Sequence, residues 1–203
     1  MRRQDLRSKV CRRFVVTTDT KHNLKASPNL LNRDFDMEVP NKVWVSDITY
    51  LRSRAGWLFL VVFLDLFSRR VVGWCVNTSL GHETVLTALS RAVWQRRPDP
   101  GLMIHSDRGV QYCCDGFREA IDTHQFVQSM SRKANCWDNA VAESFFRSLK
   151  TEWLYHVDLI DLDHAKRELF AYIEMFYNNQ RLHAYLDYVS PATFERLKPQ
   201  KVA

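Results

Sequence analysis

Three carboxylates occupy positions from which they could form one metal-binding site. Asp47 lies within the alternating stretch VWVSDITYL, Asp107 ends the stretch LMIHSD, and Glu143 lies in a helical pattern after SRKANCWDN. A carboxylate inside a strand must be solvated, paired or bound to a metal. Ligands of open α/β sheets also gather beyond the carboxyl ends of strands, where Asp107 falls. Taken singly, each acid has an ordinary alternative: an edge-strand charge, a turn aspartate before glycine, or a solvated Glu–Arg pair.

The helix around Glu143 is expected to carry basic groups beside the acid. At 100° per residue, four polar residues fall within about 40° of one line along the helix: Asn139, Glu143, Arg147 and Lys150. An apolar stripe about 90° away consists of Ala142, Phe146, Leu149 and Trp153. Such a helix buries the stripe and presents a carboxylate, a guanidinium and an ammonium group together.

The three acids in this order suggest a specific chemistry. Two acids on strands and one on a later helix can converge at one edge of a sheet. Hard divalent cations prefer oxygen ligands, and Mg²⁺ is held by a few carboxylates plus substrate phosphate. Two ions about 3.5–4 Å apart can activate an attacking oxygen and stabilise the leaving one. Arg147 and Lys150 could then hold the DNA backbone.

The patterns around these residues predict an α/β sheet with helices on both faces. Strands are expected at VWVSDITYL, LFLVVFLDL and RRVVGWCV, with a hairpin around Gly56, and short links make these three an antiparallel meander. LMIHSD and FVQSM read as two further strands. Helices are expected at roughly 83–96, 115–124, 138–153 and 163–179, and YVSPATFERL closes the chain.

Composition favours a protein that binds nucleic acid. The chain has 203 residues, is 46% hydrophobic and carries a formal net charge of +6, which suits a polyanionic partner. Its five cysteines form no zinc pattern and indicate reduced thiols. The longest apolar run, GWLFLVVFLDLF, is too short to span a bilayer. We expect a cytoplasmic protein without membrane contact, associated with the nucleoid.

Residues 1–41 differ from the rest of the chain. They hold nine basic and two acidic residues up to Arg33, with poor periodicity. This segment is predicted to be a basic linker or arm, and composition leaves open whether it tracks phosphates or is simply solvated. Residues 42–197 would form the core with its C-terminal helices, and residues 198–203 a tail.

Five stretches carry a family resemblance: PNKVWVSDITYL, GWLFLVVFLDLFSRRVVGW, HSDRGVQY, SMSRKANCWDNAVAESFFRSLKTE and YNNQRLHAYLDYVSPATFE. They resemble the catalytic reading-frame product of integrase-type (DDE) transposases of bacterial insertion sequences, whose cores resemble retroviral integrase. The family has an acidic triad with 35 residues between the last two acids, and 35 residues lie between Asp107 and Glu143.

The resemblance implies a fold, a reaction and site residues. The fold is a ribonuclease H-like mixed five-stranded sheet flanked by helices. Asp47, Asp107 and Glu143 match the triad that holds two Mg²⁺ or Mn²⁺ ions, and Lys150 matches a basic residue on the same helix. The reaction is DNA strand cleavage followed by strand transfer, with water or a DNA 3′-hydroxyl as nucleophile, carried out by homo-oligomers.

The sequence differs from the family pattern at two usual glycine positions, at two cysteines and at the start of the chain. Ala134 and Asp187 stand where relatives usually have glycine, and Cys113 and Cys114 where small hydroxyl residues are expected. Glycine at such places often marks a positive φ. Relatives carry helix-turn-helix material before the core, so this chain could be shortened, or joined by frameshifting to an upstream helix-turn-helix frame.

Several residues have a functional and a structural interpretation. His105 and Asn139 could support the triad from behind or simply pack. Asn178, Arg181 and His183 could contact DNA or form a C-terminal clasp. Asp65 is expected to be structural, with Arg69 or Arg70 as its partner.

Two alternatives to an active transposase core remain at this point. One is a truncated, non-catalytic DNA-binding fragment that modulates a full-length transposase through mixed oligomers. The other is a structure-selective nuclease on the same fold, which hydrolyses DNA without joining it.

Overall fold

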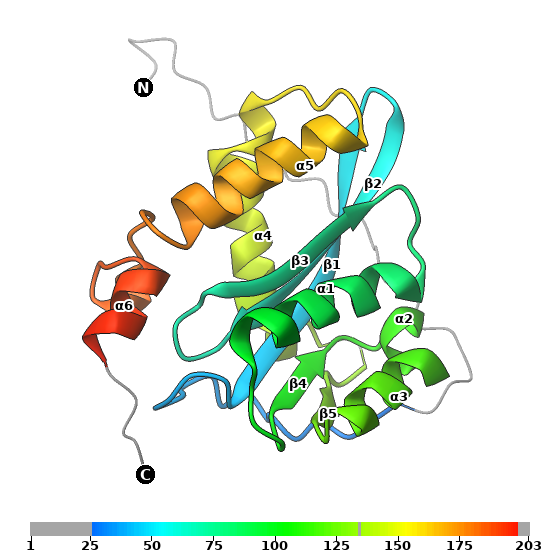
Figure 1. The fold of residues 1–203 in the computed structure, drawn as a ribbon, viewed down its shortest axis with the longest axis vertical. Helices are drawn as coiled ribbons and strands as arrows, with labels where there is room; N and C mark the ends of the chain where they lie inside the picture. Colours follow the sequence, from blue (N-terminus) through cyan, green and yellow to red (C-terminus); the bar gives the residue numbers. More distant parts are fainter. Residues whose placement is uncertain (1–25, 134, 199–203) are drawn as a thin grey trace.

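A five-stranded mixed sheet forms the centre of the computed structural model, which describes residues 26–133 and 135–198 (Figure 1). The strands are β1 (Val43–Ser53), β2 (Gly56–Asp65), β3 (Val71–Asn77), β4 (Met103–Ser106) and β5 (Val127–Met130), in the order β3-β2-β1-β4-β5. The meander β1-β2-β3 is antiparallel, whereas β4 and β5 run parallel to β1. Gly56 closes the β1–β2 hairpin at φ 132°, which only glycine adopts readily.

One face of the sheet is covered by α1 (His82–Arg96), α2 (Val110–Cys113) and α3 (Asp115–Thr123). The apolar core on this side joins Trp44, Val61 and Phe63 of the sheet to Val85 and Ala88 of α1. The helix α1 comes very close to β3, because a Cβ on Gly73 would lie 2.5 Å from the carbonyl oxygen of Ala88. Glycine in RRVVGWCV is therefore a packing requirement.

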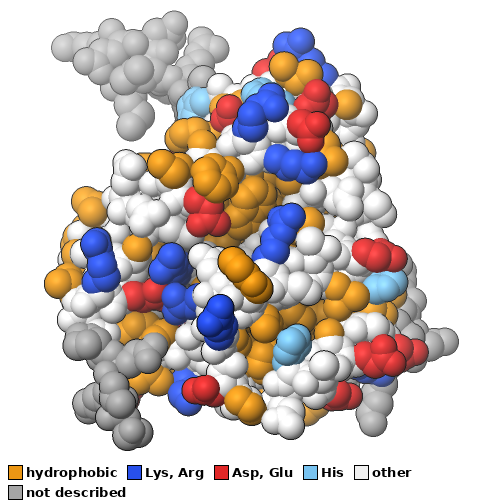
Figure 2. Space-filling view, in the orientation of Figure 1, with side chains coloured by type: hydrophobic (Ala, Val, Ile, Leu, Met, Phe, Trp, Pro, Cys, Tyr) orange, Lys and Arg blue, Asp and Glu red, His pale blue; other side chains and the backbone are white. Residues whose placement is uncertain are grey.

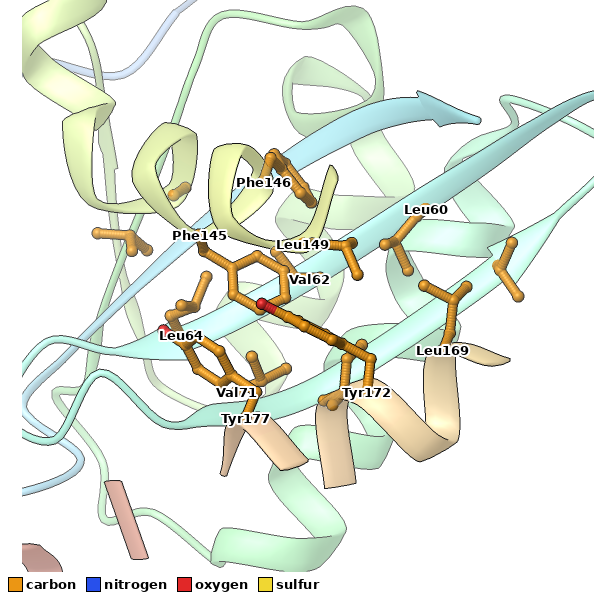
Figure 3. Close-up of a cluster of buried hydrophobic side chains, with 14 of the residues drawn as sticks. Leu60, Val62, Leu64, Val71, Phe145, Phe146, Leu149, Leu169, Tyr172 and Tyr177 are labelled. Carbon is orange, nitrogen blue, oxygen red and sulfur yellow. The ribbon is translucent and has the colours of Figure 1, made fainter. Parts of the chain in front are cut away.

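The other face is covered by α4 (Ala140–Glu152), α5 (Leu162–Phe170) and the π-helical turn η4 (Ala171–Tyr177). Figure 3 shows the α4 side chains Phe145, Phe146 and Leu149 packed over Leu60, Val62 and Leu64 of β2. Leu169, Tyr172 and Tyr177 complete this core from α5 and η4. The stripe predicted on this helix is therefore the buried face, with Phe145 added to it.

Two long helices predicted from the sequence are each divided in the structure. The expected helix 138–153 begins as the 3-10 turn η2 (Cys136–Asn139), becomes α-helical at Ala140 and is followed by η3 (Leu154–His156). The expected helix 163–179 changes from α to π geometry after Phe170.

The C-terminal elements η5 (Ala184–Leu186) and α6 (Pro191–Leu197) are fastened to the sheet by a charged network. Glu195 accepts hydrogen bonds from both terminal nitrogens of Arg96, at 2.9 and 2.8 Å, and from Arg70 at 2.9 Å. The buried carboxylate of Asp65 accepts from the backbone N–H of Asn41, and its nearest cation is Arg96 at 3.7 Å. The expected partners Arg69 and Arg70 bind Asp65 through the backbone only: Arg69 donates its N–H to the carbonyl of Asp65 at 2.8 Å, and Asp65 donates its N–H to the carbonyl of Arg70 at 2.9 Å. Asp65 is thus structural, as predicted.

Residues 26–41 of the predicted basic arm pack against the core. Leu31 is buried in the same apolar cluster as α4, and Leu30 and Leu31 donate backbone hydrogen bonds to Ser129 of β5 at 2.9 and 3.2 Å. Residues 1–25 of the arm and residues 199–203 of the tail lie outside the described residues, so the proposed domain limits stay predictions.

Candidate active site

The two aspartates lie level with each other on neighbouring parallel strands. Val45 of β1 is paired in register with His105 of β4. Asp47 follows Val45 by two residues, and Asp107 follows His105 by two residues, so both acids reach the same edge of the sheet. Asp107 stands just past the end of β4, where its carboxylate accepts the backbone N–H of Gly109 at 3.0 Å. The strand-end placement predicted from the sequence is thus observed.

The electrostatics of Asp47 show that the carboxylates influence one another. Its pKa is raised well above the ordinary value, first by burial and then by the negative charge of Asp107, with a smaller contribution from Glu143. The carboxylate accepts the backbone N–H of Ile48 at 2.8 Å, which opposes this shift. A site that holds two mutually repelling carboxylates without full solvation is one that a cation would stabilise.

Helix α4 carries both Glu143 and Lys150. Glu143 lies in the first turn of the helix with its side chain exposed, and partial burial raises the pKa of its carboxyl group. Lys150 donates a hydrogen bond of 2.6 Å to Thr49, on the same side of β1 as Asp47. Burial lowers the pKa of Lys150, and the charge of Asp47 opposes that shift. Arg147 is exposed on the same helix.

The donor set fits a hard divalent cation in chemistry, with carboxylate oxygens from Asp47, Asp107 and Glu143. Within residues 26–133 and 135–198, no three side chains of His, Cys, Asp or Glu lie close enough together to hold a metal ion. The charge of Asp107 acts on Asp47, and Glu143 would have to approach these two acids from α4.

His105 and Asn139 are both buried behind the triad. The ring nitrogens of His105 lie 2.9 Å from the hydroxyl of Ser129 and 3.2 Å from that of Ser131, and burial lowers its pKa to about 4. A neutral His105 thus joins β4 to β5. Asn139 donates a hydrogen bond of 3.2 Å to the carbonyl of Ser46, directly before Asp47. Both contacts are suited to positioning the acids.

Asn178, Arg181 and His183 make internal contacts that favour the structural alternative. Asn178 is fully buried and binds both backbone groups of Val71 at 3.0 Å. Arg181 donates two hydrogen bonds, of 2.8 and 2.6 Å, to Glu152 at the end of α4. His183 packs edge-on against a tyrosine ring, and burial lowers its pKa to about 4. These residues clasp the C-terminal segment to β3 and α4.

The positions that differ from the family pattern have mixed outcomes. Asp187 has φ 56° and ψ 39°, so the left-handed geometry expected there is observed. Ala134 lies outside the described residues. Cys113 is buried and its thiol lies 3.8 Å from the sulfur of Met130, while Cys114 donates to the carbonyl of Gln111. Both cysteines act as small packing residues here.

Three residues near the site were not singled out from the sequence. The hydroxyl groups of Tyr112 and Ser46 lie 2.8 Å apart, and burial and then the charge of Asp107 raise the pKa of Tyr112. Thr49, the partner of Lys150, was visible as a polar residue two positions after Asp47 on a strand. Asp138 stands at the predicted start of the helix 138–153, and nothing local in the sequence shows its distant partners.

Comparison with known proteins agrees with this geometry. Two family models, both described as integrase core domain, match residues 38–136 and 143–198. The chain is 40% identical over 195 residues to the transposase InsF for insertion sequence IS3A of Escherichia coli K12, covering 96% of this chain and 68% of that protein.

Solved structures show the same fold at low identity. A simian T-cell lymphotropic virus intasome structure, solved in complex with the PP2A regulatory subunit B56 gamma, aligns with TM-score 0.68 and 16% identity over 92% of this chain and 63% of that one. The HTLV-2 integrase catalytic core domain, solved in complex with magnesium in a trimeric form, aligns with TM-score 0.59 and 17% identity over 77% and 97%.

Fold and sequence together define a protein with an integrase core of the ribonuclease H-like type. More narrowly, the chain belongs to the integrase-core transposases of bacterial insertion sequences. The resemblance drawn from the five sequence stretches, and the transposase function and fold that it implied, are confirmed. None of the helices in the described part of the chain has the length and apolar character needed to cross a membrane.

Proposed function

We propose that Asp47, Asp107 and Glu143 are the catalytic carboxylates with which this transposase cleaves and joins DNA strands. The observation that carries the proposal is that Asp47 on β1 and Asp107, just past the end of the neighbouring parallel strand β4, lie level with each other, and that the charge of Asp107 raises the pKa of Asp47. Glu143 and Lys150 add the third acid and a cation from α4. The membership of the chain in the family supports the assignment.

The residues divide the work of phosphoryl transfer. Asp47, Asp107 and Glu143 would hold Mg²⁺ or Mn²⁺, which when bound supplies charge neutralisation at the phosphate and an activated oxygen nucleophile. We propose two ions, since one must serve the attacking oxygen and one the leaving oxygen. The HTLV-2 structure with magnesium supports the choice of metal. The chain itself needs no nucleophile, because water cleaves and the DNA 3′-hydroxyl joins.

Basic side chains beside the triad would hold the DNA backbone. Arg147 is exposed on α4 and free to turn toward a phosphate, and Lys150 places its ammonium group near Asp47. On the face shown in Figure 2, basic side chains are interspersed with acidic and apolar ones, so the described residues of this face carry no broad basic stripe.

Assembly and targeting are further parts of the proposal. An intasome is among the structural neighbours, which supports action as a homo-oligomer. We propose that the ends of the insertion sequence are recognised with help from an upstream helix-turn-helix frame, and that the protein works on nucleoid DNA in the cytoplasm.

The test uses the purified chain with DNA ends from the inverted repeats that flank its gene, in Mn²⁺ or Mg²⁺. Cleavage at the 3′ end and joining to a target are scored separately. We expect Asp47→Asn, Asp107→Asn and Glu143→Gln each to abolish both steps with DNA binding retained. Glu119→Gln, an exposed acid of α3, is the matched control. Cleavage without joining would indicate a nuclease, and DNA binding without cleavage a non-catalytic fragment; activity that survives Glu143→Gln would refute the assignment.

A further inference from the structure

Asp138 is a buried carboxylate that the proposed reaction does not use. It lies in η2, immediately before α4, and its side chain is fully enclosed. It accepts five hydrogen bonds of 2.8–2.9 Å, which come from Asn29 Nδ2, Arg33 Nε, and the backbone N, Nε and Nη2 of Arg132. The guanidinium of Arg132, followed by its other donors, lowers the pKa of Asp138 far below the ordinary value. These donors therefore stabilise the carboxylate form of Asp138.

The donors come from two separate parts of the chain. Arg132 belongs to the segment between β5 and α4, whereas Asn29 and Arg33 belong to the N-terminal segment, 109 and 105 positions before Asp138. Arg33 also donates to the side chain of Asn135 at 3.0 Å, so it grips the connecting segment twice. The hydrogen bonds of Leu30 and Leu31 to Ser129 place this N-terminal segment beside β5.

The segment that Asp138 holds leads directly into the catalytic helix. Asn139 follows Asp138 and donates its hydrogen bond to the carbonyl of Ser46, next to Asp47. Glu143 is one helical turn further on. Ser131, at the start of the segment, is also held: its N–H donates to the carbonyl of Ser106 at 2.8 Å, and its carbonyl accepts from Arg108 at 2.8 Å, on either side of Asp107. A shift of residues 131–139 would thus be transmitted to the start of α4 and to Glu143.

We propose that Asp138 is a positioning residue, and that its ion pair with Arg33 couples the N-terminal segment to the placement of Glu143. Charge-assisted hydrogen bonds are directional and strong, so they fix a loop that has little apolar packing. With Arg33 and Asn29 in place, residues 131–133 and 135–139 are held and Glu143 is directed to the site edge. Without them, Asp138 retains Arg132 alone, and the segment loses its contacts with the N-terminal segment, while Ser131 and Asn139 near its ends keep their hydrogen bonds. This inference rests on the proposed role of Glu143 as a metal ligand.

The first measurement is limited trypsin digestion of the folded chain, with cuts after Arg132 and Lys133 counted separately from all others. Both side chains are exposed, so trypsin can reach them. The rate of cutting is then limited by local opening of the backbone around them. We expect Arg33→Ala to accelerate these two cuts by about tenfold, as the loss of one charged hydrogen bond would, with cuts elsewhere unchanged. Arg33→Lys should restore much of the protection. Arg54→Ala removes a surface arginine paired with Asp158, far from this segment in sequence, and is the matched control.

The second measurement is equilibrium Mn²⁺ binding, followed through free Mn²⁺ by electron paramagnetic resonance. We expect Arg33→Ala to weaken Mn²⁺ binding several-fold in the wild-type background and to have no effect in the Glu143→Gln background. A purely structural role for Arg33 would give no such dependence on Glu143.

Each of the other possible outcomes would overturn the coupling, the positioning role or the metal site. Cuts after Arg132 and Lys133 that are no faster than in the Arg54→Ala control would overturn the coupling. Faster cuts with unchanged Mn²⁺ affinity, or an affinity loss that persists in Glu143→Gln, would overturn the positioning role. If the wild-type chain binds no Mn²⁺, the metal site fails together with the positioning role, while the digestion still shows whether the N-terminal segment holds residues 131–139.

Discussion

Replacing Asn178 by alanine should lower the free energy of unfolding by about 2–4 kcal/mol. The side chain of Asn178 accepts the N–H of Val71 and donates to its carbonyl, both at 3.0 Å, and makes a third hydrogen bond to Glu174 at 3.3 Å. Val71 is 1% exposed, so water has no ready access to the two backbone groups left behind. Each buried polar group without a partner costs about 1–3 kcal/mol, and partial relaxation reduces the sum.

The assay is urea unfolding at pH 7, with linear extrapolation to water. A loss of this size is a large share of the about 5–15 kcal/mol that usually separates folded from unfolded domains. Asn179→Ala is the matched control, because Asn179 is exposed and adjacent, and it should cost less than about 1 kcal/mol. DNA affinity of the folded Asn178→Ala protein should match that of the wild type. A stability loss below about 1 kcal/mol, or a tenfold loss of DNA affinity, would refute this reasoning.

Three further predictions concern the C-terminal elements. Glu195→Gln should lower the unfolding free energy by about 2–4 kcal/mol, because the acid is 13% exposed and takes a two-point hydrogen bond from Arg96; a loss below 1 kcal/mol in urea unfolding would contradict this. His183 has its pKa lowered by burial to about 4 from 6.5, so its contribution to stability is complete above pH 6.5 and is lost as the pH falls toward 4. His183→Gln should therefore flatten the dependence of unfolding free energy on pH in that window, and an unchanged slope would count against it. Asp187→Ala should destabilise by about 1 kcal/mol at φ 56°, whereas Asp187→Gly should be neutral or stabilising in thermal unfolding; the reverse order would argue against backbone strain.

The sheet and the two aspartates could be predicted from the sequence because their signals are local. The alternation in VWVSDITYL predicts which residues share a face of β1, and the turn around Gly56 predicts the hairpin. Asp107 follows an apolar stretch directly, which predicts its place at the end of a strand. Recognising the three acids as a triad required the family resemblance, since periodicity alone left each acid with an ordinary explanation.

The parts that could not be predicted depend on contacts between distant residues. The helix around Glu143 was expected to begin at Asp138, but there the carboxylate is taken up by Arg132 and by Arg33, and a 3-10 turn results. For Asn178 the sequence left a DNA contact and a structural clasp both open, since nothing local shows that its partner is Val71. Poor periodicity in residues 26–41 likewise concealed the burial of Leu31.

The position of α4 is set by polar contacts spaced along its length. Apolar packing determines how deeply the helix lies on the sheet, but it is non-directional and tolerates rotation and sliding. Hydrogen bonds fix direction. Helix α4 has them near its start through Asn139, in its last turns through Lys150, and at its end, where Glu152 accepts from Arg181. The first two contacts go to β1, the strand that carries Asp47.

Glu143 is therefore held in relation to Asp47 by contacts that need not touch DNA. Thr49→Val would remove the acceptor of Lys150 while keeping the shape of β1. If these contacts set the approach of Glu143, this variant should weaken Mn²⁺ binding and leave DNA affinity nearly unchanged. The same change would reduce DNA affinity first if Lys150 served only as a phosphate contact positioned by Thr49. Measuring both affinities on one protein preparation therefore separates the positioning of the acids from the binding of the DNA backbone.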